Sequence, residues 1–147
     1  PGSSPGRGAT QHPLKGLLAK AFVVSASSMH PKTIRLIRIT FWCSAILLAI
    51  GSLLPTDLLP RQTATIWDKG QHAFGFAWLA WLGLLTFSQK PWTVLTALLL
   101  YGGVIEVLQV VTGWRYGEWL DLLANGIGLL IGAAIWLLVR SMATPRR

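Results

Sequence analysis

Four long apolar segments, each closed by a polar or proline-containing stretch, follow the first 28 residues of the chain. They cover residues 34–54, 71–87, 92–111 and 120–139. Each is close to the ~20 residues that an α-helix needs to cross a hydrocarbon layer about 30 Å thick. The pattern therefore predicts an all-α polytopic membrane protein, built as a bundle of four transmembrane helices.

Proline, glycine and polar residues set the expected ends of these helices. Pro55 follows the first segment, and because proline lacks an amide hydrogen and restricts the residue before it, the first helix should end near Leu54. The segment from Ser88 to Pro91 predicts a tight turn between the second and third helices. The third helix should stop at Thr112-Gly113. Between the first two helices we expect a loop or a short interfacial helix that extends to Trp67.

The ends of the chain differ from this domain in composition. Residues 1–28 begin with a stretch rich in proline, glycine and serine, which buries too little apolar surface to offset the entropy of ordering. We interpret them as a disordered or non-native N-terminal extension. Met29 is the first methionine and is followed by basic residues, so we expect the natural start there and a membrane domain over residues 29–147. Residues 140–147 are predicted to form a basic tail.

The composition supports a membrane location. Hydrophobic residues make up 52% of the chain and charged residues only 12%, against roughly 25% charged residues in soluble domains. The formal net charge is +8, but the basic residues are spread over the ends of the apolar segments and form no long block. We therefore expect no nucleic-acid partner. The single cysteine, Cys43, lies within an apolar segment, and we expect it to pack as a small buried hydrophobe.

The distribution of basic residues predicts the orientation in the cytoplasmic (inner) membrane. Seven lie at one set of helix ends: Lys32, Arg35, Arg38, Lys90, Arg140, Arg146 and Arg147. Three lie at the other: Arg61, Lys69 and Arg115. Because cytoplasmic loops carry the excess of lysine and arginine, both termini should be cytoplasmic and the second set of ends should face outward.

Polar residues recur at helical spacing near the outward ends of three predicted helices. Asp68 and His72 are four residues apart, Glu106 and Gln109 three apart, and Asp121 and Asn125 four apart, so each pair shares one helix face. We expect these side chains to meet in one cleft, because ionisable groups at membrane depth are rare and usually functional. The candidate catalytic residues are His72, Asp68, Glu106 and Asp121. The candidate ligand-binding residues are Lys69, Gln109, Arg115 and Asn125. Glu118 is interpreted as a solvated loop residue.

Glycines lie on or near the same faces of the predicted helices. Small residues let helices approach closely in a membrane. The sequence therefore predicts a compact bundle in which glycines accompany the polar pairs. The glycines are Gly75, Gly83, Gly102, Gly103, Gly128 and Gly132.

Three kinds of chemistry fit this cleft, and the residues alone leave all three open. The carboxylates and His72 could hold a divalent cation, since imidazole and carboxylate groups are ordinary metal ligands. Lys69 and Arg115 could bind the phosphate of a lipid, with His72 as general acid or base. Glu106 and His72 could carry protons in a small ion transporter. Whether the protein is an enzyme therefore stays undecided at this level.

The order and spacing of these residues resembles the VanZ-like family of small membrane proteins, over residues 32–139. The resemblance depends on four motifs in this order: Ser52-Leu53-Leu54-Pro55; Asp68-Lys69-x-x-His72 followed by Phe74 and Phe76; Glu106-x-x-Gln109; and Arg115 followed by Asp121-x-x-x-Asn125-x-x-Gly128. It implies a mostly helical, multi-pass domain. The family's named member is associated with low-level resistance to teicoplanin, a glycopeptide that binds cell-wall precursors.

This resemblance leads to an expected function in the bacterial cell envelope. We expect the protein to bind or alter a cell-wall or lipid-linked component at the outer leaflet of the bilayer and to affect teicoplanin susceptibility. The expected partners are the lipid bilayer and a lipid-linked cell-wall precursor or the glycopeptide itself. The alternatives are a membrane enzyme that acts on a phosphorylated lipid, and a small ion or proton transporter.

Overall fold

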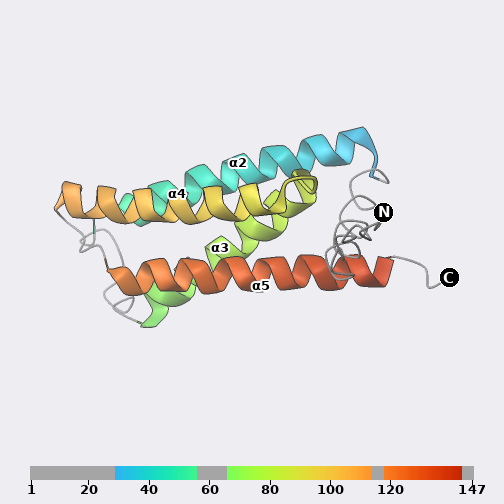
Figure 1. Ribbon diagram of the computed structural model, residues 1–147. Helices are drawn as coiled ribbons and strands as arrows, with labels where there is room; N and C mark the ends of the chain where they lie inside the picture. The colour runs from blue at the N-terminus through green and yellow to red at the C-terminus, as the bar shows by residue number, and fades with distance from the viewer. Residues whose placement is uncertain (1–28, 56–65, 114–117, 144–147) are drawn as a thin grey trace, which may run out of the picture.

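Four α-helices make up the regular structure of the described residues. The computed structural model describes residues 29–55, 66–113 and 118–143. The helices are α2 (Pro31–Leu53), α3 (Ile66–Thr86), α4 (Pro91–Thr112) and α5 (Trp119–Ala143). They run in alternating directions, so the end of α2, the start of α3, the end of α4 and the start of α5 lie at one end of the bundle (Figure 1). The predicted all-α, four-helix architecture is confirmed.

Two of the helices start at proline. Pro31 and Pro91 occupy the first turns of α2 and α4, where the missing amide hydrogen costs nothing and the fixed backbone angle suits a helix. His30 adds a cap to α2, because its Nδ1 accepts a hydrogen bond from the backbone N–H of Lys32 at 3.3 Å. The predicted tight turn is present and closes at Lys90, directly before α4 begins at Pro91.

Helices α2 and α4 end where the sequence predicts. The residue after α2, Leu54, has an extended backbone and is followed by Pro55, so the helix cannot continue. The residue after α4, Gly113, adopts the left-handed conformation with φ of 76°. A side chain at that position would be strained, which is why glycine commonly follows a helix end.

The other two helices are longer than their apolar segments. α3 begins at Ile66, before the predicted residue 71, because Asp68, Lys69 and Gln71 are compatible with a helix although they are polar. α5 continues past residue 139 to Ala143. The prediction that the basic tail begins at residue 140 is therefore wrong. Arg140 is a buried helical residue, and its guanidinium carbon lies 5.1 Å from the centroid of the Trp136 ring.

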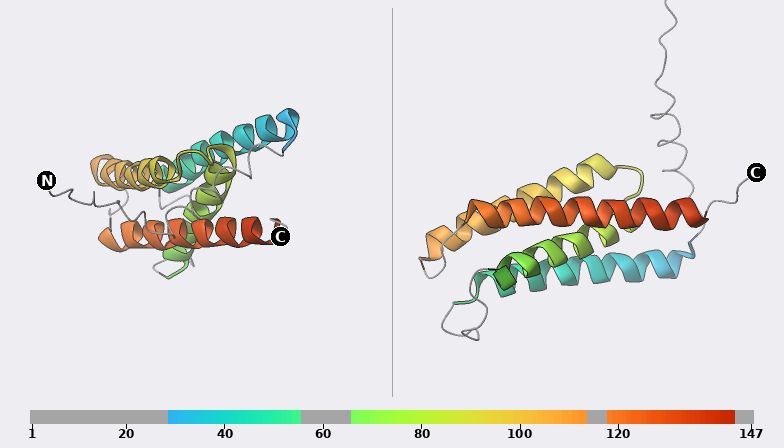
Figure 2. Two further views of the ribbon diagram at one scale, coloured as in Figure 1. Left: turned by 45° about the vertical axis from the view of Figure 1, so that its right-hand side comes forward. Right: turned by 90° about the horizontal axis from the view of Figure 1, so that it is seen from below.

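Helix α3 is the central element of the bundle. It contacts each of the other three helices, and it lies between α2 and α5 in both further views (Figure 2). Its side chains dominate the hydrophobic core, with Phe76, Leu79, Ala80 and Leu84 almost fully buried. Side chains of α2, α4 and α5 complete the core around them. The core members on these helices include Phe41, Leu98, Leu129 and Trp136.

Close contact between the backbones of α3 and α5 depends on two glycines. A Cβ atom at Gly128 would lie 2.2 Å from the carbonyl oxygen of Ala73, and one at Gly132 would lie 2.2 Å from that of Ala77. Neither distance leaves room for a side chain. The glycines are four residues apart, the spacing by which small residues bring membrane helices together. The predicted role of glycines in packing is confirmed here, whereas Gly103 faces open space.

Three of the helices are long and apolar enough to cross a membrane: Pro31–Leu53, Pro91–Thr112 and Trp119–Met142. Many large apolar side chains on their outer faces are exposed, as expected of surfaces that meet lipid. Cys43 is also exposed, so the expectation that it is buried is wrong.

The predicted second span, α3, does not meet the same criterion among the described residues, because its first turns carry Lys69, Gln71 and His72. By length and composition, three of the described helices can therefore cross a membrane. The inner face of α3 is buried by its contacts with the other three helices, whereas Phe74 and Trp78 are exposed.

Candidate functional site

A buried hydrogen bond joins α3 and α5 near the end of the bundle where α3 begins. Nδ1 of His72 lies 3.1 Å from Oδ1 of Asn125. Both side chains are buried, and only 3% of the surface of His72 is exposed. An amide oxygen can only accept, so Nδ1 carries the hydrogen and donates it. The neutral imidazole then has its lone pair on Nε2, the nitrogen that can accept a proton or bind a ligand.

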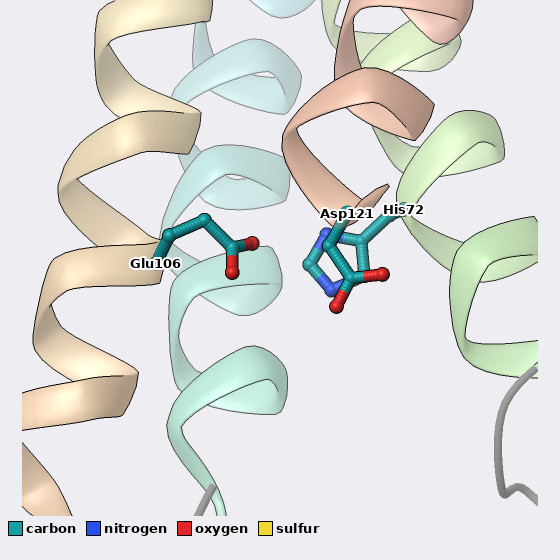
Figure 3. Close-up of side chains that lie close together, drawn as sticks. All are labelled: His72, Glu106 and Asp121. Atoms are coloured by element: carbon teal, nitrogen blue, oxygen red, sulfur yellow. The ribbon is translucent and has the colours of Figure 1, made fainter. Parts of the chain in front are cut away.

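Two carboxylates lie beside this imidazole. One ring nitrogen of His72 and one carboxylate oxygen each from Glu106 and Asp121 are all within 4.8 Å of one another. The Glu106 side chain extends from α4 toward the other two groups, which lie together on α3 and α5 (Figure 3). His72 and Asp121 are buried and Glu106 is partly buried. We call these three residues the polar cluster. The structure thus brings together three of the four candidate catalytic residues.

Lys69 and Glu118 form the outer edge of the polar cluster. Nζ of Lys69 lies 2.7 Å from Oε2 of Glu118 and 3.6 Å from Oδ1 of Asp121. The backbone N–H of Glu118 donates a hydrogen bond of 3.1 Å to Oε2 of Glu106. The side chains of Lys69 and Glu118 are 28% and 46% exposed. The cluster is therefore reached from this end of the bundle.

The charge on Lys69 is stabilised by this arrangement. Lys69 precedes the apolar part of α3, and its hydrogen bond to Glu118 raises the pKa of its ammonium group above the usual lysine value. Asp121 acts in the same direction through its negative charge. The side chain of Lys69 is therefore protonated at neutral pH and places a positive charge beside the carboxylates.

Glu118 lies beside the polar cluster, a position that the sequence interpretation missed. It is exposed and precedes α5, as expected of a solvated loop residue, but its backbone contacts Glu106 and its side chain pairs with Lys69. A usable signal was its spacing, because Glu118 precedes Asp121 by three residues and so belongs to the same turn at the start of α5.

Gln109 connects α4 to α2, while its expected role in ligand binding stays a prediction. Its side chain is buried, and its Nε2 donates a hydrogen bond of 2.9 Å to the backbone carbonyl of Ser52. That carbonyl belongs to the last turn of α2, where the helix itself supplies no partner. Among the described residues, Oε1 of Gln109 has no hydrogen-bond partner. Gln109 thus links α4 to the end of α2. This hydrogen bond connects two of the sequence motifs, the one that begins at Ser52 and the one that ends at Gln109.

A glycine on α4 makes room for Asn125. A Cβ atom at Gly102 would lie 2.7 Å from Nδ2 of Asn125 and 3.0 Å from Cζ of Phe76. Either contact would displace a fully buried side chain. Gly102 therefore helps to keep Asn125 where it can accept the hydrogen bond from His72.

Two candidate site residues fall outside the described part of the chain. The backbone of Asp68 belongs to α3, but its side chain is not described, and Arg115 lies in the undescribed segment 114–117. Their expected places in the cleft stay predictions.

A groove between α2 and α4 differs in chemistry from the polar cluster. It has a volume of about 400 Å³ and is lined almost wholly by apolar atoms. Its walls include Phe41, Ala45, Leu98 and Tyr101. None of the polar cluster lines it. The polar cluster thus has groups that can transfer protons or bind ions. The groove offers only apolar contacts.

The chain matches the model of one protein family, described as VanZ/LLP1, over residues 17–140. The match begins before Lys32, the first residue of the region over which the sequence resembles VanZ-like proteins. It includes every residue of the polar cluster, together with Lys69, Glu118 and Asn125. Comparison with curated proteins and with solved structures gave no match.

Proposed function

Because the chain belongs to the VanZ/LLP1 family, we propose that it is an envelope protein of the cytoplasmic membrane that binds and alters the head group of a lipid-linked component. The membrane part of this proposal is supported by three helices of spanning length and composition. The cell-wall part comes from the resemblance to VanZ-like proteins. The polar cluster of His72, Glu106 and Asp121 is the proposed place of action.

One observation supports this function above all others. A buried imidazole, oriented by Asn125, lies within 4.8 Å of two carboxylates in a bundle whose core is mostly apolar. Helix packing alone needs no such group, because polar contacts between membrane helices average only about 0.6 kcal/mol. An oriented imidazole that keeps a lone pair on Nε2 is suited to accept or donate a proton at a reacting group.

The position of the polar cluster favours a substrate that lies in the membrane surface. Lys69 and Glu118 are partly exposed at the edge of the cluster, while apolar helix faces extend away from it. The head group of a lipid-linked substrate would contact the charged residues, and its hydrocarbon chain would contact the apolar helix faces. Lys69 offers a positive charge to a phosphate, and His72 offers the proton-transfer group.

The alternative of an ion transporter receives less support. Between the cluster and the buried Thr86, Ser88 and Arg140 toward the opposite end of the bundle, the most buried side chains of the described part are apolar and include Phe76, Leu79 and Ile105. A path for protons or ions needs polar groups or water along its length. A site that opens to one membrane surface agrees better with chemistry on a lipid.

The charge distribution supports one orientation of the protein in the membrane. The excess of lysine and arginine at the opposite helix ends supports cytoplasmic termini, and with them a polar cluster at the outer leaflet. Cell-wall precursors and glycopeptides meet at that surface. The proposal therefore includes an effect on teicoplanin susceptibility through a changed lipid-linked precursor.

A comparison of lipids from living cells tests this function. The wild-type chain and His72→Ala would be expressed at equal membrane levels in a bacterium that lacks its own copy. Lipid extracts are then compared by mass spectrometry, and teicoplanin susceptibility is measured on the same cultures. We expect the wild type alone to change the level of a lipid-linked component. Identical lipid profiles for the wild type, His72→Ala and the empty vector would contradict the proposal.

A further inference from the structure

We propose that the polar cluster binds a divalent transition-metal ion, held by Nε2 of His72 and by the carboxylates of Glu106 and Asp121. The use of this ion on a lipid head group depends on the function proposed above. The binding of the ion does not, because it follows from the geometry and charge of these three residues.

The separation of the three groups fits a single ion. Their ligand atoms lie within 4.8 Å of one another and come from three different helices, α3, α4 and α5. Zinc ligands lie about 2.0–2.2 Å from the metal. Ligand atoms at this distance from a tetrahedral ion are about 3.4 Å apart, so binding would draw the three atoms together by up to about 1.4 Å through changes in side-chain torsion angles.

The orientation of His72 is the second observation that points to a ligand. A histidine that binds a metal almost always donates its other ring N–H to a carbonyl or carboxylate, which fixes the ring. Here Nδ1 donates to Oδ1 of Asn125 at 3.1 Å. Nε2 takes no part in this bond, and the residue is only 3% exposed. A buried imidazole, oriented through Nδ1, thereby lies next to two carboxylates.

The balance of charge also favours a cation. Among the described side chains, Glu106, Asp121 and Glu118 are three carboxylates near one ammonium group, that of Lys69. A divalent ion would offset the excess. It would also remove the repulsion that a lipid phosphate would otherwise meet from Glu106 and Asp121.

The ligand set indicates the class of metal. Imidazole suits zinc, iron, copper and nickel, whereas carboxylates alone suit magnesium, calcium and manganese. One imidazole with two carboxylates therefore favours Zn²⁺ or a similar transition metal over Mg²⁺ and Ca²⁺. Three protein ligands leave a further position open for water or a phosphate oxygen, as in catalytic zinc sites.

Metal binding can be measured directly on the purified full chain. The protein is isolated in detergent with a tag that contains no histidine, stripped with chelator, dialysed against Zn²⁺ or Co²⁺, and its metal content determined. We expect about one ion per chain, and for Co²⁺ a visible absorption band typical of nitrogen and oxygen ligands. No retained ion, or a Co²⁺ spectrum like that of the free ion, would overturn the proposal.

Variants then assign the ligands. His72→Ala, Glu106→Gln and Asp121→Asn should each weaken binding at least tenfold. The matched control is His30→Ala, because His30 caps α2 and lies outside the polar cluster. Asn125→Ala should weaken binding by about 10–100-fold through loss of orientation, as other second partners of metal-binding histidines do. Folding of each variant is checked by its elution and helical content. Equal affinity of folded His72→Ala and the wild type would overturn the proposal.

The same preparations separate this inference from the proposed function. Retained metal without any change in lipids would count against the function alone. A change in lipids that persists after complete metal removal would keep the function and overturn the use of the ion. Loss of both metal binding and lipid change in His72→Ala, but not in His30→Ala, is the expected result.

Discussion

The imidazole of His72 donates a hydrogen bond to the side-chain oxygen of Asn125 across 53 positions of the chain. The bond exists because α3 and α5 touch backbone to backbone at Gly128, only three residues after Asn125. Packing of these two helices therefore sets the position of the imidazole. Changes in that packing should reach the polar cluster even when they leave its own residues intact.

The contact at Gly128 gives the first prediction. Gly128→Ala places a Cβ atom 2.2 Å from the carbonyl oxygen of Ala73, so the helices must move apart. Overpacking of this kind costs about 1–3 kcal/mol. We expect Gly128→Ala to lower the free energy of unfolding in detergent by about this amount. The control is Gly126→Ala, because a Cβ atom at Gly126 meets nothing within 4 Å. Equal stability of the two variants would show that the close contact is absent.

The second prediction concerns two neighbouring glycines of α4, Gly102 and Gly103, of which only Gly102 contacts a residue that orients His72. Gly102→Ala should push against Nδ2 of Asn125 and the ring of Phe76, and so disturb the hydrogen bond to His72. Gly103→Ala should be harmless, since that position faces open space. We expect Gly102→Ala to reduce the lipid-directed activity at least tenfold and Gly103→Ala to leave it unchanged. Full activity in Gly102→Ala would argue against a role for Asn125 in positioning.

Much of the fold was predictable because its signals are local. Apolar segments of about 20 residues identify membrane helices, and Pro55 and Gly113 define two helix ends by backbone chemistry alone. The start of α3 at Ile66 was not predictable from hydropathy, since its first turns are polar. Neither was the burial of Arg140, because its contact with the Trp136 ring depends on how the end of α5 packs.

The candidate site was predictable in its members and less so in its contacts. Helical spacing placed His72, Glu106 and Asp121 at one end of the bundle, and the structure brings them within 4.8 Å. The bond from Gln109 to the carbonyl of Ser52 could not be foreseen, because a backbone carbonyl has no signature in a sequence. Glu118 was missed for a related reason, since its backbone N–H contributes as much as its side chain.

Asn125 itself carries the third prediction. Asn125→Ala leaves the buried Nδ1 of His72 without an acceptor, and an unsatisfied buried group costs about 1–3 kcal/mol. Asn125→Asp keeps an acceptor oxygen at the same distance. We expect Asn125→Ala to lose stability and most activity, and Asn125→Asp to keep most activity. Thermal unfolding and lipid turnover measured on both variants check this. Equal losses in the two would show that the acceptor oxygen is not what matters.

Lys69 gives the fourth prediction. Lys69→Gln removes the ion pairs to Glu118 and Asp121, but partly exposed pairs contribute little to stability. We therefore expect a small but measurable drop in melting temperature together with a clear loss of activity on a phosphorylated lipid. Lys90→Gln at the opposite end of the bundle is the control and should behave as the wild type. A large loss of stability in Lys69→Gln would instead indicate a structural role.

The same residue predicts a dependence on pH. The pKa of Lys69 is raised in the folded protein, so its contribution to stability is complete below the ordinary lysine pKa of about 10.4 and is lost as the pH rises through the raised value. The difference in stability between wild type and Lys69→Gln should therefore be constant from neutral pH to pH 9 and shrink in stronger alkali. A difference that already disappears near neutral pH would contradict the raised pKa.

Orientation in the membrane supplies the fifth prediction. In a Cys43→Ser background, Gln71→Cys and Gln89→Cys place single exposed thiols at opposite ends of the bundle. A reagent that cannot cross membranes should label position 71 in intact spheroplasts, and position 89 only after the membrane is opened. The reverse pattern would place the polar cluster at the cytoplasmic surface.

The most direct test of the proposed function is lipid turnover by the purified protein in liposomes. Wild type and His72→Ala are reconstituted at equal density with phospholipid and undecaprenyl-linked phosphate substrates, each with and without Zn²⁺, and the products are followed by mass spectrometry. We predict that the wild type changes one lipid-linked substrate and that folded His72→Ala does so at least a hundredfold more slowly. Equal turnover by the two proteins, or none by the wild type with any of these lipids, would contradict a functional site at His72.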